Sequence, residues 1–179
     1  YGLPEQTISQ WEKTLNESVK FEIQHISAYG LKIEPETPFS KIYTDNHKDI
    51  PSDDICEKMF LITDKILTDN DFKHYEISNY AKYDLFSQHN LNYWHNNSYY
   101  GFGLAAHSFI DNKRYENISI MSDYMGNYKD YKNIHTPNNK ELIEDEIFLN
   151  LRTSSGIDLS RFYNKHKIVF KDKYKLILD

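Results

Sequence analysis

The sequence predicts an α/β protein: the C-terminal units of a partial (β/α) barrel, followed by a small, mainly helical domain. Strand-like and amphipathic segments alternate over residues 1–79, an order typical of right-handed βαβ units and a parallel sheet. The elements expected near the C-terminal end are helices. We therefore place the barrel part, with its strand-end loops, at residues 1–112 and an incomplete helical domain at residues 113–179.

The first helix is expected over residues 8–20. Its apolar side chains recur every three to four residues, the period of an amphipathic helix: Ile8, Trp11, Leu15 and Val19. Thr7 and Gln10 fit the capping box that begins such helices. Residues 1–4 read as the end of a strand that runs into a loop.

Two strands and a helix complete the predicted barrel part. Residues 25–33 read as a strand that ends at Pro35, because proline restricts the residue before it. After a polar loop at 39–51, Ser52 is expected to cap a second helix. Residues 72–79 read as the next strand. In (β/α) barrels the chemistry sits at the carboxyl ends of such strands.

The second half of the chain has weaker signals. Residues 80–98 are polar and aromatic without clear periodicity, which indicates a loop. We expect helices at 120–131 and 140–152, a loop at 133–139 between them, and a short helix capped by Asp158. Acidic side chains of the longer helix are expected to face water: Glu141, Glu144, Asp145 and Glu146.

Composition excludes several classes of protein. Lys and Arg number 21 against 27 Asp and Glu, a net charge of −6, which argues against a general nucleic-acid binder. No apolar run approaches the roughly 20 residues of a membrane-spanning helix, so peripheral contact is the only membrane role left open. Cys56 is the single cysteine, which excludes an internal disulfide or a cysteine-only metal site.

The chain ends are unusual. Tyr1 stands where methionine is expected, no signal or transit segment follows it, and the C-terminal residues are apolar-rich. We expect a fragment of a longer chain, the alternative being a complete small domain.

The densest group of chemically useful side chains lies at residues 89–95, where two histidines flank a tyrosine and a tryptophan. Haem needs an iron ligand such as imidazole and flat apolar walls, and this segment offers both. An aromatic loop packed on the core, with histidines at the surface, explains the same residues without a ligand.

Two other segments are candidates. Residues 101–108 carry two glycines and His107, so the backbone there could approach a ligand closely; a tight crossing of backbone against the sheet is the alternative. Glu34 and Glu36 end a predicted strand and could do acid–base work, or simply face water. Glu76 is expected in mid-strand, where a carboxylate is usually paired or functional; a position on one face of an edge strand is the alternative.

Six blocks in order resemble one family: residues 1–7, 25–29, 33–38, 74–81, 89–94 and 101–108. Together they are similar to the C-terminal half of the radical S-adenosylmethionine (SAM) proteins called oxygen-independent coproporphyrinogen III oxidase-like, and within them to the haem-chaperone branch. The resemblance implies a partial (β/α) barrel with a helical C-terminal domain, a [4Fe-4S] cluster and bound SAM. The cluster's three-cysteine motif is absent here and Cys56 does not match it, so this chain alone is not expected to perform radical chemistry and no catalytic residue is assigned.

The resemblance also implies site residues. The His-Asn-x-x-Tyr-Trp block of the haem-chaperone branch corresponds to His89, Asn90, Tyr93 and Trp94, with iron at His89. Positions that line SAM in the related oxidases correspond to Lys32 and His107. The sequence departs from the family pattern at two places near the expected ligand-binding face. Glu5 replaces a usual glycine, and Leu104-Ala105 replaces Pro-Gly.

The function implied is that of a cytoplasmic haem chaperone, which binds haem and transfers it to haem-accepting proteins. The alternative is oxidative decarboxylation of coproporphyrinogen III in porphyrin biosynthesis. A truncated, non-functional gene product is a third possibility.

Overall fold

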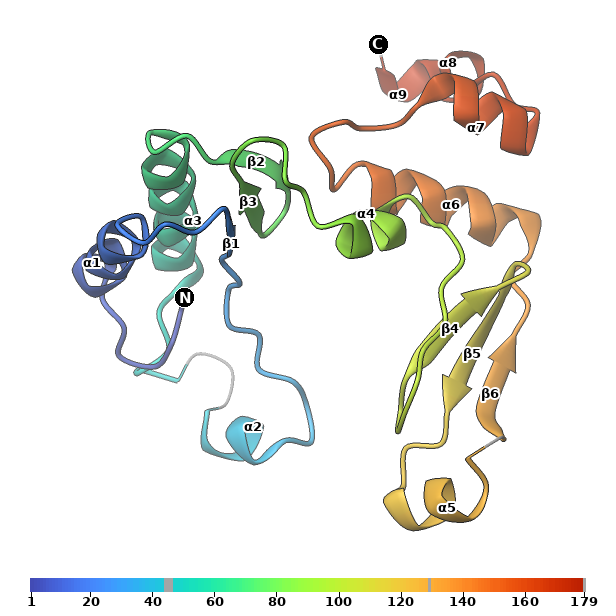
Figure 1. Cartoon of the computed structure of the whole chain (residues 1–179), viewed down its shortest axis with the longest axis horizontal. Helices are drawn as coiled ribbons and strands as arrows, with labels where there is room; N and C mark the ends of the chain where they lie inside the picture. Colours follow the sequence, from blue (N-terminus) through green and yellow to red (C-terminus); the bar gives the residue numbers. More distant parts are fainter. Residues whose placement is uncertain (44–46, 129, 179) are drawn as a thin grey trace. The chain divides into compact units, whose positions relative to one another are not determined.

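The computed structural model describes residues 1–43, 47–128 and 130–178 (Figure 1). The chain divides into two compact units, Tyr1–Phe86 and Ser87–Asp179. The division falls before the boundary expected at residue 112, and the functional division at that residue stays a prediction. Among the described residues, no helix is long and apolar enough to cross a membrane.

The helices of the first unit are α1 Ile8–Ser18, α2 Pro38–Ile42 and α3 Asp53–Thr68. The capping box of α1 is confirmed, because Thr7 accepts from the Gln10 amide and the Gln10 side chain bonds back to Thr7. Ser52 is the N-cap of α3, as expected, although its side chain makes no capping hydrogen bond. The polar loop expected at 39–51 is wrong in part, since α2 begins at Pro38 and extends into it; residues 44–46 of that loop lie outside the described residues.

The first sheet contains β1 His25–Ser27, β2 Lys73–Glu76 and β3 Asn79–Ala81, in the order β1-β3-β2. Both outer strands run antiparallel to β3, so the expectation of a purely parallel sheet is wrong. The expectation of a single strand over residues 72–79 is also wrong, because these residues form β2, a turn and the start of β3. The chain reverses at Ile77 and Ser78, and the returning residues fill the place between β1 and β2.

The strand expected at 25–33 is also shorter than predicted, because only His25–Ser27 pairs with β3. Beyond it the chain lies against Tyr1. The Tyr1 amino group donates to the Tyr29 carbonyl over 2.7 Å, and the Leu31 amide donates to the Tyr1 carbonyl over 2.7 Å. Two parallel strands exchange hydrogen bonds in this way, so Tyr1 of the predicted strand end at residues 1–4 makes parallel backbone contacts with residues 29–31.

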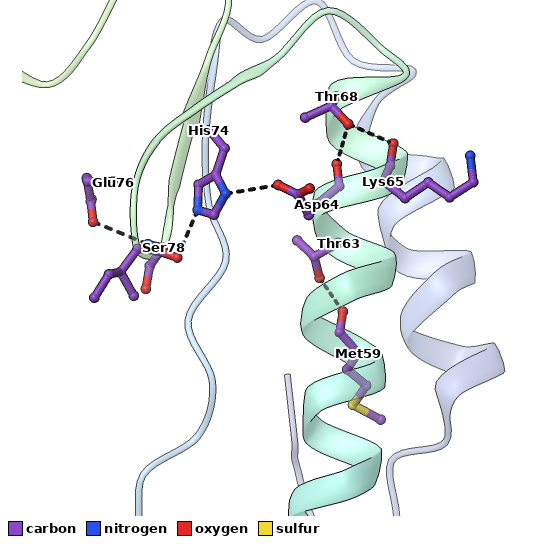
Figure 2. A network of polar contacts seen from close by, with 9 residues as sticks. Met59, Thr63, Asp64, Lys65, Thr68, His74, Glu76 and Ser78 are labelled. Carbon is purple, nitrogen blue, oxygen red and sulfur yellow. Dashed lines mark hydrogen bonds and ion pairs between the residues drawn. The ribbon is translucent and has the colours of Figure 1, made fainter. Parts of the chain in front are cut away.

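A turn and a helix are tied together by His74, as Figure 2 shows. Its Nδ1 lies 2.9 Å from an Asp64 carboxylate oxygen on α3, and its Nε2 lies 3.1 Å from the Ile77 carbonyl in the β2–β3 turn. The ring stacks on Tyr80, with centroids 4.2 Å apart. Both ring nitrogens face acceptors, so a proton on each nitrogen satisfies both contacts.

The core of the first unit lies where α1 and α3 pack together over the sheet. Its buried members are Leu15, Ala28, Leu67, Phe72 and Tyr80. Burying each large side chain of this kind contributes about 1.5–3 kcal/mol. The buried Thr63 hydroxyl on α3 accepts a hydrogen bond from the Trp11 indole on α1 over 2.9 Å, which fixes how the two helices meet.

The second unit combines a sheet with helices. Its strands, β4 His107–Ile110, β5 Lys113–Asn117 and β6 Tyr131–His135, form an antiparallel sheet in sequence order. Its helices are α4 Gln88–Trp94, α5 Met121–Gly126, α6 Asn139–Asn150, α7 Leu159–His166, α8 Phe170–Lys173 and α9 Lys175–Leu178.

Several expectations for this unit are corrected. The loop expected at 80–98 contains α4, and the helix expected at 120–131 ends at Gly126. The loop expected at 133–139 begins inside β6. The helix at 140–152 is confirmed as α6, and the short helix capped by Asp158 is confirmed as α7.

The expectation that Glu146 faces water is wrong. It lies on the inner face of α6 with its side chain 3% exposed, and its carboxylate pairs with Lys165 over 2.7 Å and His166 over 3.0 Å on α7. Burial is the largest single influence and raises the pKa of this carboxyl, but the hydrogen bonds and the electrostatic attraction of Lys165 and His166 together outweigh it and leave the pKa below its usual value. This ionic group therefore joins α6 to α7.

Candidate functional site

The four residues assigned to haem all lie on helix α4. The helix begins after Ser87, whose hydroxyl accepts from the Asn90 amide over 3.3 Å. This helix lies in a segment that was expected to be a loop. Its available signals were a serine at the N-cap position and the absence of glycine and proline from residues 88–95.

The helix brings His89 and Tyr93 together, because residues four apart lie on the same face. The Tyr93 hydroxyl oxygen lies 3.0 Å from His89 Nε2, and the two rings meet edge to face with centroids 4.8 Å apart. His89 is exposed and Tyr93 is half-buried. Tyr93 also contacts Tyr99, whose ring stands at 82° to that of Tyr93 with centroids 4.5 Å apart.

Trp94 has a different environment. Its ring contacts Arg152, which follows helix α6, with the guanidinium carbon 5.9 Å from the ring centroid. The buried indole Nε1 has no hydrogen-bond partner among the described residues, an uncommon state for an indole. Of the four predicted residues, His89 and Tyr93 therefore contact each other, whereas Trp94 contacts Arg152. Asn90 contributes its backbone amide to the start of the helix.

The glycine-rich segment is a close backbone crossing. Tyr99 and Phe109 exchange backbone hydrogen bonds of 2.8 and 3.0 Å, so the chain before Gly101 runs beside β4. A Cβ on Gly101 would stand 2.6 Å from the carbonyl carbon of His107. The Gly101 amide donates to the buried Ser108 hydroxyl over 2.9 Å. The structure thus favours the crossing interpretation for Gly101.

The two positions assigned to SAM lie in different units. Lys32 is exposed in the first unit and forms an ion pair with Glu34 over 2.9 Å. His107 begins β4 in the second unit, opposite Glu116, and is exposed. Neither side chain is enclosed by its own unit.

Both departures from the family pattern occur at special backbone angles. Glu5 has φ 60° and Ala105 has φ 57°, in the left-handed region that glycine adopts without strain. The positive φ explains why glycine is usual at each position. This chain keeps the same backbone conformation although Glu5 and Ala105 each carry a side chain.

Glu76 is not in mid-strand as expected, because it ends β2 at the turn. It is 3% exposed, and its carboxylate accepts from the Ser78 amide over 3.2 Å and from the Asn79 side-chain amide. Asn79 in turn accepts from the Ser27 hydroxyl of β1. This buried polar group holds the turn to both neighbouring strands.

Metal-binding groups are sparse in the described parts of the chain. No set of three His, Cys, Asp or Glu side chains gathers there in a way that could hold a metal ion. Cys56 is half-buried, and burial, with the nearby Asp53 carboxylate, raises the pKa of its thiol. A raised thiol pKa opposes the thiolate form that binds metals.

Comparison with known proteins gives a consistent assignment. The chain matches no protein-family model. It is 33% identical over 170 residues to the heme chaperone HemW of Bacillus subtilis (strain 168), covering 93% of this chain and 45% of that protein. It is 32% identical over 176 residues to HemW of Lactococcus lactis subsp. lactis (strain IL1403), covering 97% of this chain and 46% of that protein.

The comparison with solved structures agrees with the comparison of sequences. The structure of coproporphyrinogen III oxidase (HemN) from Escherichia coli, a radical SAM enzyme, matches with a TM-score of 0.77 at 16% identity, over 98% of this chain and 44% of that one. The chain is a HemW/HemN-like radical SAM fragment. The HemN likeness confirms the predicted fold class, an α/β part of a radical SAM fold. This HemW/HemN-like fragment spans less than half the length of the relatives named here.

Proposed function

We propose that the chain is part of a haem chaperone, which binds haem and passes it to acceptor proteins in the cytoplasm. The observation that carries the proposal is the His89–Tyr93 pair on α4, with 3.0 Å between the imidazole nitrogen and the phenol oxygen. The names of the relatives in Bacillus subtilis and Lactococcus lactis support it.

The donor set on α4 fits haem. Imidazole and phenolate are both iron ligands in haem proteins, and Tyr99 adds a flat ring beside the pair. Trp94 supplies an indole N–H without a hydrogen-bond partner among the described residues. When bound, haem would supply the iron and the flat porphyrin, while His89, Tyr93 and Trp94 would hold and orient it.

The [4Fe-4S] cluster does not fit the residues present, because Cys56 is the single cysteine. We assign its ligands to residues outside this chain and derive no step through it. Lys32 and His107 remain the proposed SAM-contacting positions.

A haem titration of the chain followed by absorbance tests this function. We expect saturable binding near one haem per chain, strongly weakened in the double variant His89→Ala/Tyr93→Phe. His135→Ala is the matched control, because this exposed histidine of the same unit lies on β6. Transfer is measured by adding an apo-haem protein and following its spectrum. Absence of saturable binding would contradict the proposal.

The HemN fold likeness supports a second candidate, oxidative decarboxylation of coproporphyrinogen III. It is tested with the complete reading frame, its cluster reconstituted. Formation of protoporphyrinogen under anaerobic conditions would favour this candidate, and haem transfer without that product would favour the chaperone.

A further inference from the structure

The hydrogen bond between His89 and Tyr93 determines which atoms of the pair are free to bind iron. If the Tyr93 hydroxyl donates, the lone pair of His89 Nε2 is occupied; if Nε2–H donates, that nitrogen has no lone pair to offer. The phenol oxygen keeps an unused lone pair in both cases. His89 Nδ1, next to Cβ, is the less accessible ring nitrogen.

The two rings also differ in how firmly they are held. Tyr93 is half-buried and contacts His89 on one side and Tyr99 on the other, with ring centroids 4.8 and 4.5 Å away. His89 is exposed. An iron ligand held in one orientation loses less conformational freedom on binding, which favours the phenol oxygen.

We propose that Tyr93, through its phenol oxygen, is the iron ligand of the haem site, and that His89 is a positioning residue. The inference rests on the proposed haem-binding function. When haem binds, the Tyr93 O–H bond would break, the oxygen would keep the electron pair and offer it to iron, and the proton would leave to solvent. His89 Nε2–H would then donate to the phenolate oxygen and hold it in place.

This assignment makes binding depend on the oxidation state of iron. An anionic oxygen ligand stabilises the more highly charged ferric ion more than the ferrous ion, because the Coulomb attraction grows with the charge of the metal. Ferric haem should therefore be held tightly by Tyr93, and reduction by an added electron donor should loosen it.

The test uses the intact chain loaded with ferric haem, examined by absorbance and electron paramagnetic resonance. The wild type should show a phenolate-to-iron charge-transfer band and a high-spin ferric signal. Tyr93→Phe should lose the charge-transfer band and bind at least tenfold more weakly. His89→Ala should keep the band with a several-fold weaker affinity, and Tyr93→His should give an imidazole spectrum.

Tyr100→Phe is the matched control, since this tyrosine is 68% exposed in the same unit and should change neither spectrum nor affinity. Circular dichroism shows that each variant keeps its helices. Dithionite reduction should release haem from the wild type, and retention at unchanged affinity would overturn the assignment.

The outcomes separate this inference from the function on which it rests. A spectrum unchanged in Tyr93→Phe but lost in His89→Ala would make His89 the ligand and overturn the inference, while haem binding stands. A spectrum unchanged in both variants would overturn it equally. A wild type that binds no haem would overturn both.

Discussion

Ala105 holds a left-handed backbone conformation with φ 57°, and it is exposed, so little besides its own backbone geometry decides the effect of replacing it. Ala105→Gly should stabilise the chain by about 0.5–1 kcal/mol, because the relief of strain exceeds the larger entropy of an unfolded glycine.

The measurement is urea unfolding at 25 °C. Ala106→Gly is the neighbouring control, since Ala106 does not have a positive φ, and it should lose about 0.5–1 kcal/mol. Equal effects of the two substitutions would show that backbone angle is not the cause.

Glu146 gives a prediction on pH. Its pKa is lowered in the folded chain, so its stabilising contribution is complete above the usual carboxyl pKa and is lost as the pH falls through the lowered value. Glu146→Gln should cost about 3 kcal/mol at pH 7, because His166 and Lys165 lose a buried partner.

Urea unfolding at pH 7 and at acid pH checks this prediction. The difference between wild type and Glu146→Gln should shrink as the solution is acidified below the usual glutamate pKa of about 4.3. Glu144→Gln, an exposed change on the same helix, should have little effect at either pH. A constant difference would contradict the argument.

The candidate site could be predicted in part. The residue types at 89–94 are visible in the sequence, but the His89–Tyr93 contact depends on a helix whose periodic apolar pattern is weak. Similarly, Glu146 belongs to an acidic run typical of a solvated face, and only the position of α7 explains its burial. Long-range partners of this kind leave no local signal.

At the scale of elements, helix α6 offers a test of its N-terminal cap. Asn138 accepts from the amides of Lys140 and Glu141 over 2.9 and 3.1 Å, and Glu141 accepts from the Asn138 amide over 2.7 Å. Asn138→Ala should cost about 1 kcal/mol.

Asn139→Ala serves as the control, because this residue lies one position inside the helix and should be neutral or slightly favourable. Thermal unfolding followed by circular dichroism measures both. Equal melting temperatures for the two variants would exclude the capping contribution.

The helices were easier to predict than the strands. Capping boxes and apolar spacing are local, and α1, α3, α6 and α7 were all expected close to where they lie. The reversal at Ile77 and Ser78 was missed, because no glycine or proline marks it. Its stability comes from Glu76 and Asn79, whose partners lie on other strands.

For the whole molecule, the division into two compact units predicts local unfolding confined to one unit at a time. Thr63→Val removes the acceptor of the Trp11 indole, which should cost about 1–3 kcal/mol in the first unit. Glu146→Gln should act in the second unit.

Hydrogen exchange measured by mass spectrometry tests this division. Thr63→Val should speed exchange in peptides from Tyr1–Phe86 and leave those from the second unit unchanged, and Glu146→Gln should do the opposite. Faster exchange throughout the chain in either variant would indicate one cooperative unit.

The β4–β5 hairpin has a tight turn in which Asp111 and Asn112 both have positive φ, 50° and 57°, the geometry of a two-residue type I′ turn. Register in such a hairpin is set by the number of turn residues. An in-frame loss of one codon here would shift β5 against β4 by one position and turn the Asn117 side chain away from the Gly103 carbonyl, to which it donates over 2.8 Å. The genetic reading frame would be intact, yet β5 would no longer support the glycine-rich crossing, so the length of this turn should be under strong selection.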